Sequence, residues 1–229
     1  PRPLTEDATN PLSLETSYTD PAGNNGEARS TANFAVNTLG HTVSSVAITS
    51  AAGIQNNFLN AGDNVTVTVT YSETVIVDTT NGSPTLTIVV GSTNRTAAYV
   101  SGSNSTQLVF QYTIQDGEND SNGISIGADS IALNSSTITD TTANIAALTH
   151  NAVSDDSSYK VDTTVPSVNS FAMSDTEIKI GDTPTVTLTF SEAVTGFSSS
   201  ADITIASMDN GTASGSLSTM SSTDNESWT

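Results

Sequence analysis

The chain repeats itself, and this repeat limits the possible folds more than any single motif does. Residues 61–75, AGDNVTVTVTYSETV, match residues 180–194, IGDTPTVTLTFSEAV, 119 positions later. Residues 34–48, FAVNTLGHTVSSVAI, match residues 159–173, YKVDTTVPSVNSFAM, 125 positions later. Matches at a nearly constant offset predict a tandem array of similar domains.

The order of the repeated motifs predicts the domain boundaries. In a third match, residues 18–26, YTDPAGNNG, are similar to residues 138–146, ITDTTANIA. In the order of motifs along the chain, this TD…N turn comes after the GD…SE strand. Residues 39–164 contain the full order once, from one joint to the next. Residues 1–38 contain only its end, and residues 165–229 only its beginning. We therefore expect a complete domain flanked by two halves of another, the second half being completed by the 1–38 segment of a neighbouring unit or copy.

The complete unit is expected to be all-β. In VTVTVTY, Val65, Val67, Val69 and Tyr71 alternate with threonines, as in a strand with one face in the core. No clean helical stripe appears in the chain, and turn residues separate the short apolar runs. About seven strands with turns between them predict a β-sandwich. The expected strands are residues 43–49, 65–71, 85–90, 95–101, 107–113, 124–133 (interrupted) and 157–162, with two more near 12–19 and 31–37.

Charge and composition exclude several classes of function. The 24 acidic residues against 5 basic ones give a net charge of −19, which disfavours nucleic acid and anionic lipid as partners. The chain has no cysteine, so a disulfide framework and a thiolate metal site are impossible. No apolar run is long enough for a membrane helix. His41 and His150 stand alone, and no nucleophile–base pair is recognisable, so we do not expect an enzyme.

The joint sequence VDTTVP, together with GD…TFSEAV, resembles the bacterial immunoglobulin-like repeats of large surface and biofilm-associated adhesins secreted by type I systems. The resemblance extends over essentially the whole chain. It implies tandem Ig-like β-sandwich domains in an extracellular stalk, calcium at the joints, and repeats without catalytic activity. The first joint departs from the pattern because Asn37 replaces the aspartate and His41 replaces the proline.

Topology predicts where the acidic residues gather. In a sandwich with alternating strands, the entering joint, the GD…SE strand end and the TD…N turn meet at one pole. The oxygen ligands that calcium prefers would then converge there. In the complete domain they are Asn37, Glu73, Asp140 and Asn144. In the second domain they are Asp162, Glu192, Asp20 and Asn24, the last two supplied by the completing half.

A second acidic stretch, QDGENDSNG, lies at the opposite pole. Asp116, Glu118 and Asp120 stand at every second residue, as in a calcium loop, although the glycine and glutamate positions of an EF-hand are absent. A second hypothesis is that these three residues bind calcium. The alternative is that they are ordinary solvated turn residues.

Three functions remain open at this point. The first is a structural repeat segment of an extracellular surface adhesin or fibre, stiffened by calcium and joined head-to-tail to similar repeats. The second is a filament subunit that assembles head-to-tail by complementation of half-domains. The third is a glycan- or ice-binding module. The sequence does not identify an adhesion target.

Overall fold

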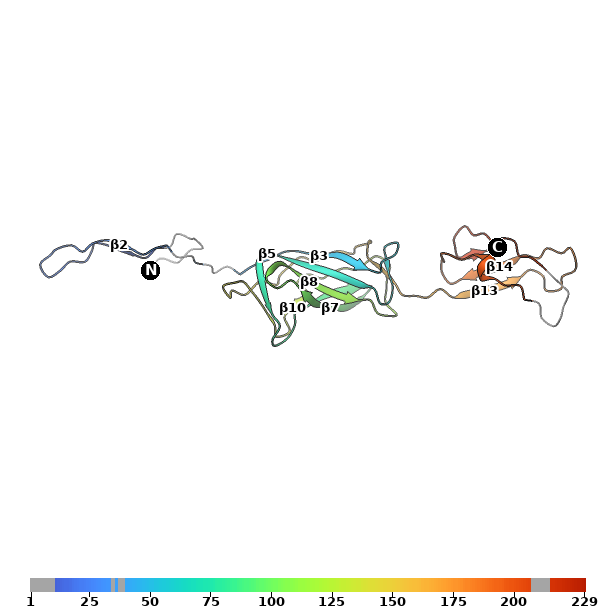
Figure 1. Ribbon diagram of the computed structural model, residues 1–229, viewed down its shortest axis with the longest axis horizontal. Coiled ribbons are helices and arrows are strands. Elements are labelled where there is room, and N and C mark those ends of the chain that lie inside the picture. The colour runs from blue at the N-terminus through green and yellow to red at the C-terminus, as the bar shows by residue number, and fades with distance from the viewer. Residues whose placement is uncertain (1–10, 34–35, 37–39, 207–214) are drawn as a thin grey trace. The chain divides into compact units, whose positions relative to one another are not determined.

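The computed structural model describes residues 11–33, 36, 40–206 and 215–229 (Figure 1). The chain divides into two compact units, residues 1–163 and residues 164–229, which are described separately. The boundary falls inside the VDTTVP stretch, where the repeat predicted a joint. Almost all regular structure is β; the helix α1 (Ser199–Asp202) has four residues.

The first unit contains twelve described strands. They are β1 (Ser13–Leu14), β2 (Arg29–Ser30), β3 (Val43–Ala52), β4 (Phe58–Leu59), β5 (Asn64–Asp78), β6 (Thr85–Val90), β7 (Thr93–Ser101), β8 (Ser105–Thr113), β9 (Asn119–Asp120), β10 (Ile131–Ala132), β11 (Thr137–Thr139) and β12 (Lys160–Asp162).

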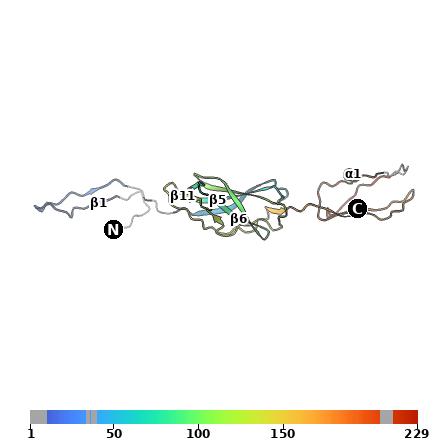
Figure 2. The ribbon, with the colours of Figure 1, turned by 90° about the horizontal axis from the view of Figure 1, so that it is seen from below.

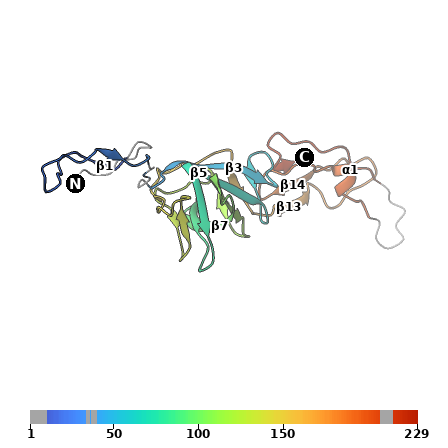
Figure 3. The ribbon, with the colours of Figure 1, turned by 60° about the vertical axis from the view of Figure 1, so that its left-hand side comes forward.

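The long strand β5 organises the main sheet. The order is β10-β6-β7-β8-β5-β11, and β3 also pairs with β5. Figure 2 labels β5, β6 and β11 of this sheet, and Figure 3 labels β3, β5 and β7. The first half of β5 lies between β3 and β8, and its second half pairs with β11. Val65, Val67 and Val69 are fully buried and Tyr71 is 2% exposed, which confirms the predicted alternation. Each buried valine contributes roughly 1.5–3 kcal/mol.

A second, smaller sheet covers this buried face. Its order is β4-β12-β9, with β12 parallel to β4 and antiparallel to β9. Leu59 of β4 and Val161 of β12 belong to the same core cluster as Leu86, Leu108 and Phe110 of the main sheet. Two sheets around one apolar core form a β-sandwich, so the predicted Ig-like all-β class is confirmed.

The strand expectations differ from the structure mainly after residue 113. The interrupted strand expected at 124–133 consists of β10 and two isolated bridges, Val89 to Ser125 and Ile126 to Val153. Glycines and polar turns break this stretch into short pieces, so little periodicity is left to recognise. The strand expected at 65–71 extends instead over all of β5, because a register shift after Thr70 lets it turn to a second partner.

Residues 11–33 form a ribbon in which β1 pairs only with β2 among the described strands. Ser13 lies opposite Ser30, and Leu14 opposite Arg29. β1 covers only part of the strand expected at 12–19, and β2 lies just before the strand expected at 31–37, of which residues 34, 35 and 37 lie outside the described residues. The division of 1–38 from 39–164 as separate domains stays a prediction.

The second unit repeats the beginning of the sandwich. Its strands are β13 (Val168–Met173), β14 (Val186–Phe190) and β15 (Ser227–Trp228), in the order β13-β14-β15. Phe171 pairs with Leu188 just as Val46 pairs with Val69, at the 125 and 119 offsets of the sequence repeat. Both strand pairs also have a register shift at the same place, Val168/Ser170 and Val43/Ser45.

Candidate functional site

The TD…N turn is built around Asp140, whose side chain organises the local backbone. The backbone N–H groups of Thr142 and Asn144 donate to Asp140 Oδ1 over 2.7 and 2.8 Å, and Asn144 Nδ2 donates to Oδ2 over 2.8 Å. Ala143 has a φ of 67°, which the turn requires. Burial raises the pKa of Asp140, but the hydrogen bonds from Asn144 and Thr142 outweigh it and hold the pKa well below its ordinary value.

The same turn occurs in residues 18–26. Asn24 donates to Asp20 from its backbone N–H over 2.8 Å and from Nδ2 over 2.8 Å. The glycine Gly23, with a φ of 87°, stands where Ala143 stands in the sandwich. The hydrogen bond from the Asn24 side chain is the main reason that the pKa of Asp20 is lowered. The predicted pairs Asp20/Asn24 and Asp140/Asn144 are therefore each brought together, as equivalent turns.

His41 connects the predicted residues of the entering pole. Its Nε2 lies 3.3 Å from Asp140 Oδ2, and its Nδ1 lies 3.8 Å from Glu73 Oε2. His41 is only 5% exposed and Asp140 only 3%, whereas the Glu73 side chain is 69% exposed. Two residues that the topology argument assigned to one pole, Glu73 and Asp140, thus both lie near His41. No role was assigned to His41 from the sequence, although the departure of this position from proline was the available signal.

The acids of the opposite pole have internal partners. Glu118 is 4% exposed and forms an ion pair with Arg95 Nε. Tyr112 donates its hydroxyl to Glu118 Oε1 over 2.5 Å, and the Gln115 N–H donates to Oε2 over 2.9 Å. Burial, and then Glu118, raises the pKa of Tyr112 to about 12. Glu118 acts here as a structural acceptor, which the sequence analysis missed because Arg95 lies 23 residues away.

Asp120 and Asp116 have different surroundings from Glu118. Asp120 is 3% exposed, and its two oxygens accept the backbone N–H groups of Gly91 over 2.7 Å and Gly123 over 2.8 Å. Asp116 is exposed. The three acids expected to share one calcium loop are therefore divided between the domain interior and its surface. Whether calcium binds there stays a prediction.

The acids of the second joint belong to different units. Asp162 ends β12, where it lies opposite Asn119 of β9. In the second unit, Glu192 Oε1 is shielded from solvent and accepts no hydrogen bond from a described residue. A carboxylate oxygen in that condition is energetically costly unless a donor or a cation satisfies it. Asn37, the remaining candidate ligand, lies outside the described residues.

The two units share a further detail next to these acids. In the sandwich, Ser72 N–H donates to the Thr42 carbonyl over 2.9 Å, and Thr42 N–H donates to Ser72 Oγ over 3.2 Å. In the second unit, Ser191 N–H donates to the Ser167 carbonyl over 2.8 Å, and Ser167 N–H donates to Ser191 Oγ over 2.9 Å. The joint is thus tied to the SE motif in the same way in both copies.

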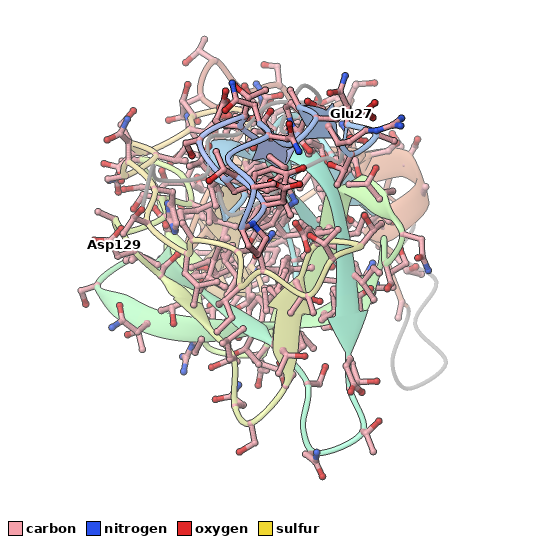
Figure 4. All side chains as sticks on the ribbon, turned by 90° about the vertical axis from the view of Figure 1, so that its left-hand side faces the viewer. Glu27 and Asp129 are labelled. Atoms are coloured by element: carbon pink, nitrogen blue, oxygen red, sulfur yellow. The ribbon has the colours of Figure 1, made fainter. Side chains whose placement is uncertain are left out.

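A serine and a histidine do approach each other near a groove of about 610 Å³ beside β3. Ser130 Oγ lies 3.1 Å from His150 Nε2, but the Ser130 backbone N–H donates to that same nitrogen over 2.9 Å. The single lone pair of a neutral imidazole nitrogen is therefore already used. Asp129, labelled in Figure 4, accepts the His150 backbone N–H over 2.9 Å, whereas the ring Nδ1 lies 2.8 Å from the Asn151 carbonyl oxygen. This arrangement fixes a turn and gives no activated nucleophile.

Two negative findings apply to the described part of the chain. No group of three or more His, Asp or Glu side chains there could by itself hold a metal ion. In the same residues, no helix is long and apolar enough to cross a membrane. The calcium hypothesis, which also needs Asn and backbone oxygens, is not tested by the first finding.

Residues 162–229 match a family model described as Bacterial Ig-like domain. The match begins at Asp162 and covers the whole second unit. Searches among curated proteins and among solved structures gave no match. Since β13 and β14 reproduce the register of β3 and β5, the bacterial Ig-like character of the second unit agrees with the sandwich seen in the first.

Proposed function

We propose that this chain is a structural repeat segment of an extracellular bacterial surface adhesin or fibre. Its role is mechanical: sandwiches in series hold a binding domain at a distance from the cell. The observation that supports this best is the repetition of one strand register and one joint tie in both units. Head-to-tail domains of one kind, without an activated nucleophile in the described residues, suit a spacer better than an enzyme.

We further propose that calcium stiffens the second joint through Glu192, Asp162 and Asp20. At the first joint, the two ring nitrogens of His41 lie near Glu73 and Asp140. At the second joint the equivalent position is Pro166, whose side chain has no polar group. The Glu192 oxygen without a hydrogen-bond donor is where a cation would relieve the electrostatic cost.

The chemistry of these side chains fits calcium. Carboxylate and amide oxygens are the ligands that calcium takes, and it accepts six to eight of them in flexible geometry. Extracellular modules bind calcium with dissociation constants of roughly 10⁻⁴ to 10⁻³ M. A net charge of −19 adds long-range attraction for any cation. Bound calcium would neutralise carboxylates that otherwise repel each other across a joint of a few residues.

Small-angle X-ray scattering of the full chain tests this proposal, in millimolar calcium and in chelator. We expect a larger and better-defined maximum dimension with calcium, and loss of this response in Asp162→Ala and Glu192→Gln. Glu177→Gln, an exposed acid of the second unit, is the matched control and should respond like the unmodified chain. A profile that does not change with calcium would contradict calcium stiffening while leaving the spacer role in place.

A further inference from the structure

Four asparagines of the chain are followed directly by glycine. They form the pairs Asn25–Gly26, Asn81–Gly82, Asn122–Gly123 and Asn210–Gly211. The dipeptide is chemically labile in water, because glycine has no side chain to shield its amide nitrogen from the neighbouring asparagine side chain. The last pair lies outside the described residues. The other three asparagines are all exposed, so exposure of the asparagine does not distinguish these pairs.

Two of the glycine amides are held in short hydrogen bonds. The Gly26 N–H donates to the Tyr18 carbonyl over 2.8 Å. The Gly123 N–H donates to Asp120 Oδ1 over 2.8 Å, within the buried part of the sandwich. A backbone nitrogen can attack a carbonyl only after its hydrogen bond opens and its proton is lost, which is also the requirement for hydrogen exchange. Both glycines are therefore protected by the fold.

The Asn81–Gly82 pair lacks this protection. The Gly82 N–H reaches only the Thr79 carbonyl, over 3.4 Å, which is longer than an ordinary hydrogen bond of this type. In the part of the chain that the structure describes, the Asn81 side chain forms no hydrogen bond. By contrast, Asn122 Nδ2 donates to Asp155 Oδ2 over 2.5 Å. At Asn81, both the attacking nitrogen and the side chain that it attacks are thus free to meet.

We propose that Asn81 is a site of spontaneous deamidation. The Gly82 nitrogen, having given its proton to water or hydroxide, attacks Cγ of Asn81. The new C–N bond closes a succinimide ring, and the side-chain nitrogen takes up a proton and leaves as ammonia. Water then adds to one of the two ring carbonyls and opens the ring. One opening gives aspartate, and the other gives isoaspartate, so the net change consumes one water and releases one ammonia.

The loop that contains Asn81 is packed closely enough to distinguish the two products. It joins β5 to β6 at the far end of the long strand β5 (Figure 3). A Cβ atom added to Gly82 would collide with the carbonyl oxygen of Asn134, so the loop backbone lies directly against the turn between β10 and β11. Asn134 Nδ2 also donates to the Ser83 carbonyl over 3.3 Å and to Thr85 Oγ1 over 2.8 Å.

Isoaspartate lengthens the main chain by a methylene group immediately before Gly82. The lengthened chain cannot keep both the tight turn and the close approach to Asn134. Because β10 pairs with β6 and β11 pairs with β5, the two turns close the same end of the sheet. The isoaspartyl product would therefore loosen this end of the sandwich. Aspartate leaves the path of the backbone unchanged and adds only an exposed charge.

Incubation of the full chain at mildly alkaline pH, followed by peptide mapping with mass spectrometry, measures the rate of deamidation at each pair. In the folded chain, Asn81 should react fastest, and Asn122 should react about tenfold or more slowly, because one net hydrogen bond lowers the population of the open amide by about that factor. In guanidinium chloride the rates at Asn25, Asn81 and Asn122 should converge, since the hydrogen bonds of the fold are lost. Asn81→Gln is the matched control: its longer side chain disfavours ring closure, so deamidation should disappear there and continue at the other sites.

The outcomes either support or overturn the proposal. Equal rates at the three sites of the folded chain, or a faster rate at Asn25 or Asn122 than at Asn81, would overturn it. Hydrogen exchange of residues 79–84 provides the second readout. The isoaspartyl fraction of the incubated chain should exchange faster there than the fresh chain, whereas Asn81→Asp should exchange like the fresh chain. Unchanged exchange in the isoaspartyl fraction would show that the modification does not loosen the loop.

Discussion

Strands β5 and β14 have the same alternating sequence and the same register with the preceding strand, but very different burial. Val65, Val67 and Val69 of β5 are fully buried, whereas in β14 only Leu188, at 5% exposure, is buried. The strands that precede them also differ: β3 has half-buried residues spaced among exposed ones, whereas β13 is exposed throughout. Local sequence therefore sets pairing and register, while burial depends on strands that lie far away along the chain.

Truncation of a core aromatic should show the largest difference between the two units. Phe110 is fully buried and stacks edge-on against Tyr99, with ring centroids 5.8 Å apart. We expect Phe110→Ala to destabilise the sandwich by about 3–5 kcal/mol. Phe171 lies in the second unit and is 58% exposed, so Phe171→Ala should change the free energy of unfolding of that unit by less than about 0.5 kcal/mol. Urea unfolding followed by far-UV circular dichroism measures the two changes in free energy of unfolding. Similar losses in the two variants would contradict the difference in burial between the units.

Removal of the Glu118 charge should have the next largest effect. Glu118→Gln removes the negative charge that pairs with Arg95 and replaces one of the two acceptor oxygens used by Tyr112 and the Gln115 N–H with an NH₂ group. We expect a loss of about 2 kcal/mol, a value reduced because Arg95 is 37% exposed. Asp116→Asn, in the same loop but exposed, is the control and should be nearly neutral.

Calcium titration of these two variants decides between a structural and a ligand role for Glu118. A structural role predicts that Glu118→Gln lowers the urea midpoint without a proportionate change in calcium affinity. Loss of calcium binding at unchanged stability would identify Glu118 as a ligand instead.

Acid should weaken the sandwich through the Asp140 turn. The folded-state pKa of Asp140 is depressed below the ordinary value of 3.8, so its contribution to stability is complete above that pH. As pH falls, the Asp140 carboxylate is protonated in the unfolded chain before it is protonated in the folded one, which favours unfolding. The stabilising contribution of Asp140 is therefore lost as pH falls toward and through the folded-state pKa. The stability difference between the unmodified chain and Asp140→Asn should therefore shrink as pH is lowered from 5 toward 2. A difference that stays constant with pH would contradict this account of the turn.

The smallest expected effect concerns a turn that both units share. Asp63 Oδ2 accepts the Asn60 N–H over 2.9 Å, and Asp182 Oδ2 accepts the Lys179 N–H over 2.7 Å. Asp63→Ala should lower sandwich stability by about 1 kcal/mol, the usual value for one such hydrogen bond. Asp182→Ala should leave the urea midpoint of the sandwich unchanged, since it lies in the other unit. A shift of that midpoint would show that the units unfold as one.

The sequence predicted the all-β sandwich class and the alternating burial of β5 because these depend on local alternation and on turn residues between strands. It also brought Glu73 and Asp140 to one pole, since strand topology decides that. It did not reveal that Glu118 and Asp120 are buried, because acids in a polar loop are indistinguishable from solvated ones without their partners. Arg95 and Gly91, which satisfy these two acids, come from another part of the main sheet.

Hydrogen exchange of the full chain, read by mass spectrometry, tests most directly the claim that local sequence sets pairing while burial sets stability. We predict that the amides of β5 exchange slowly, since Val65, Val67 and Val69 are fully buried in the sandwich. The amides of β14 should exchange much faster, because β14 has the same register with its preceding strand but only one buried residue. Protection of β14 equal to that of β5 would contradict the account.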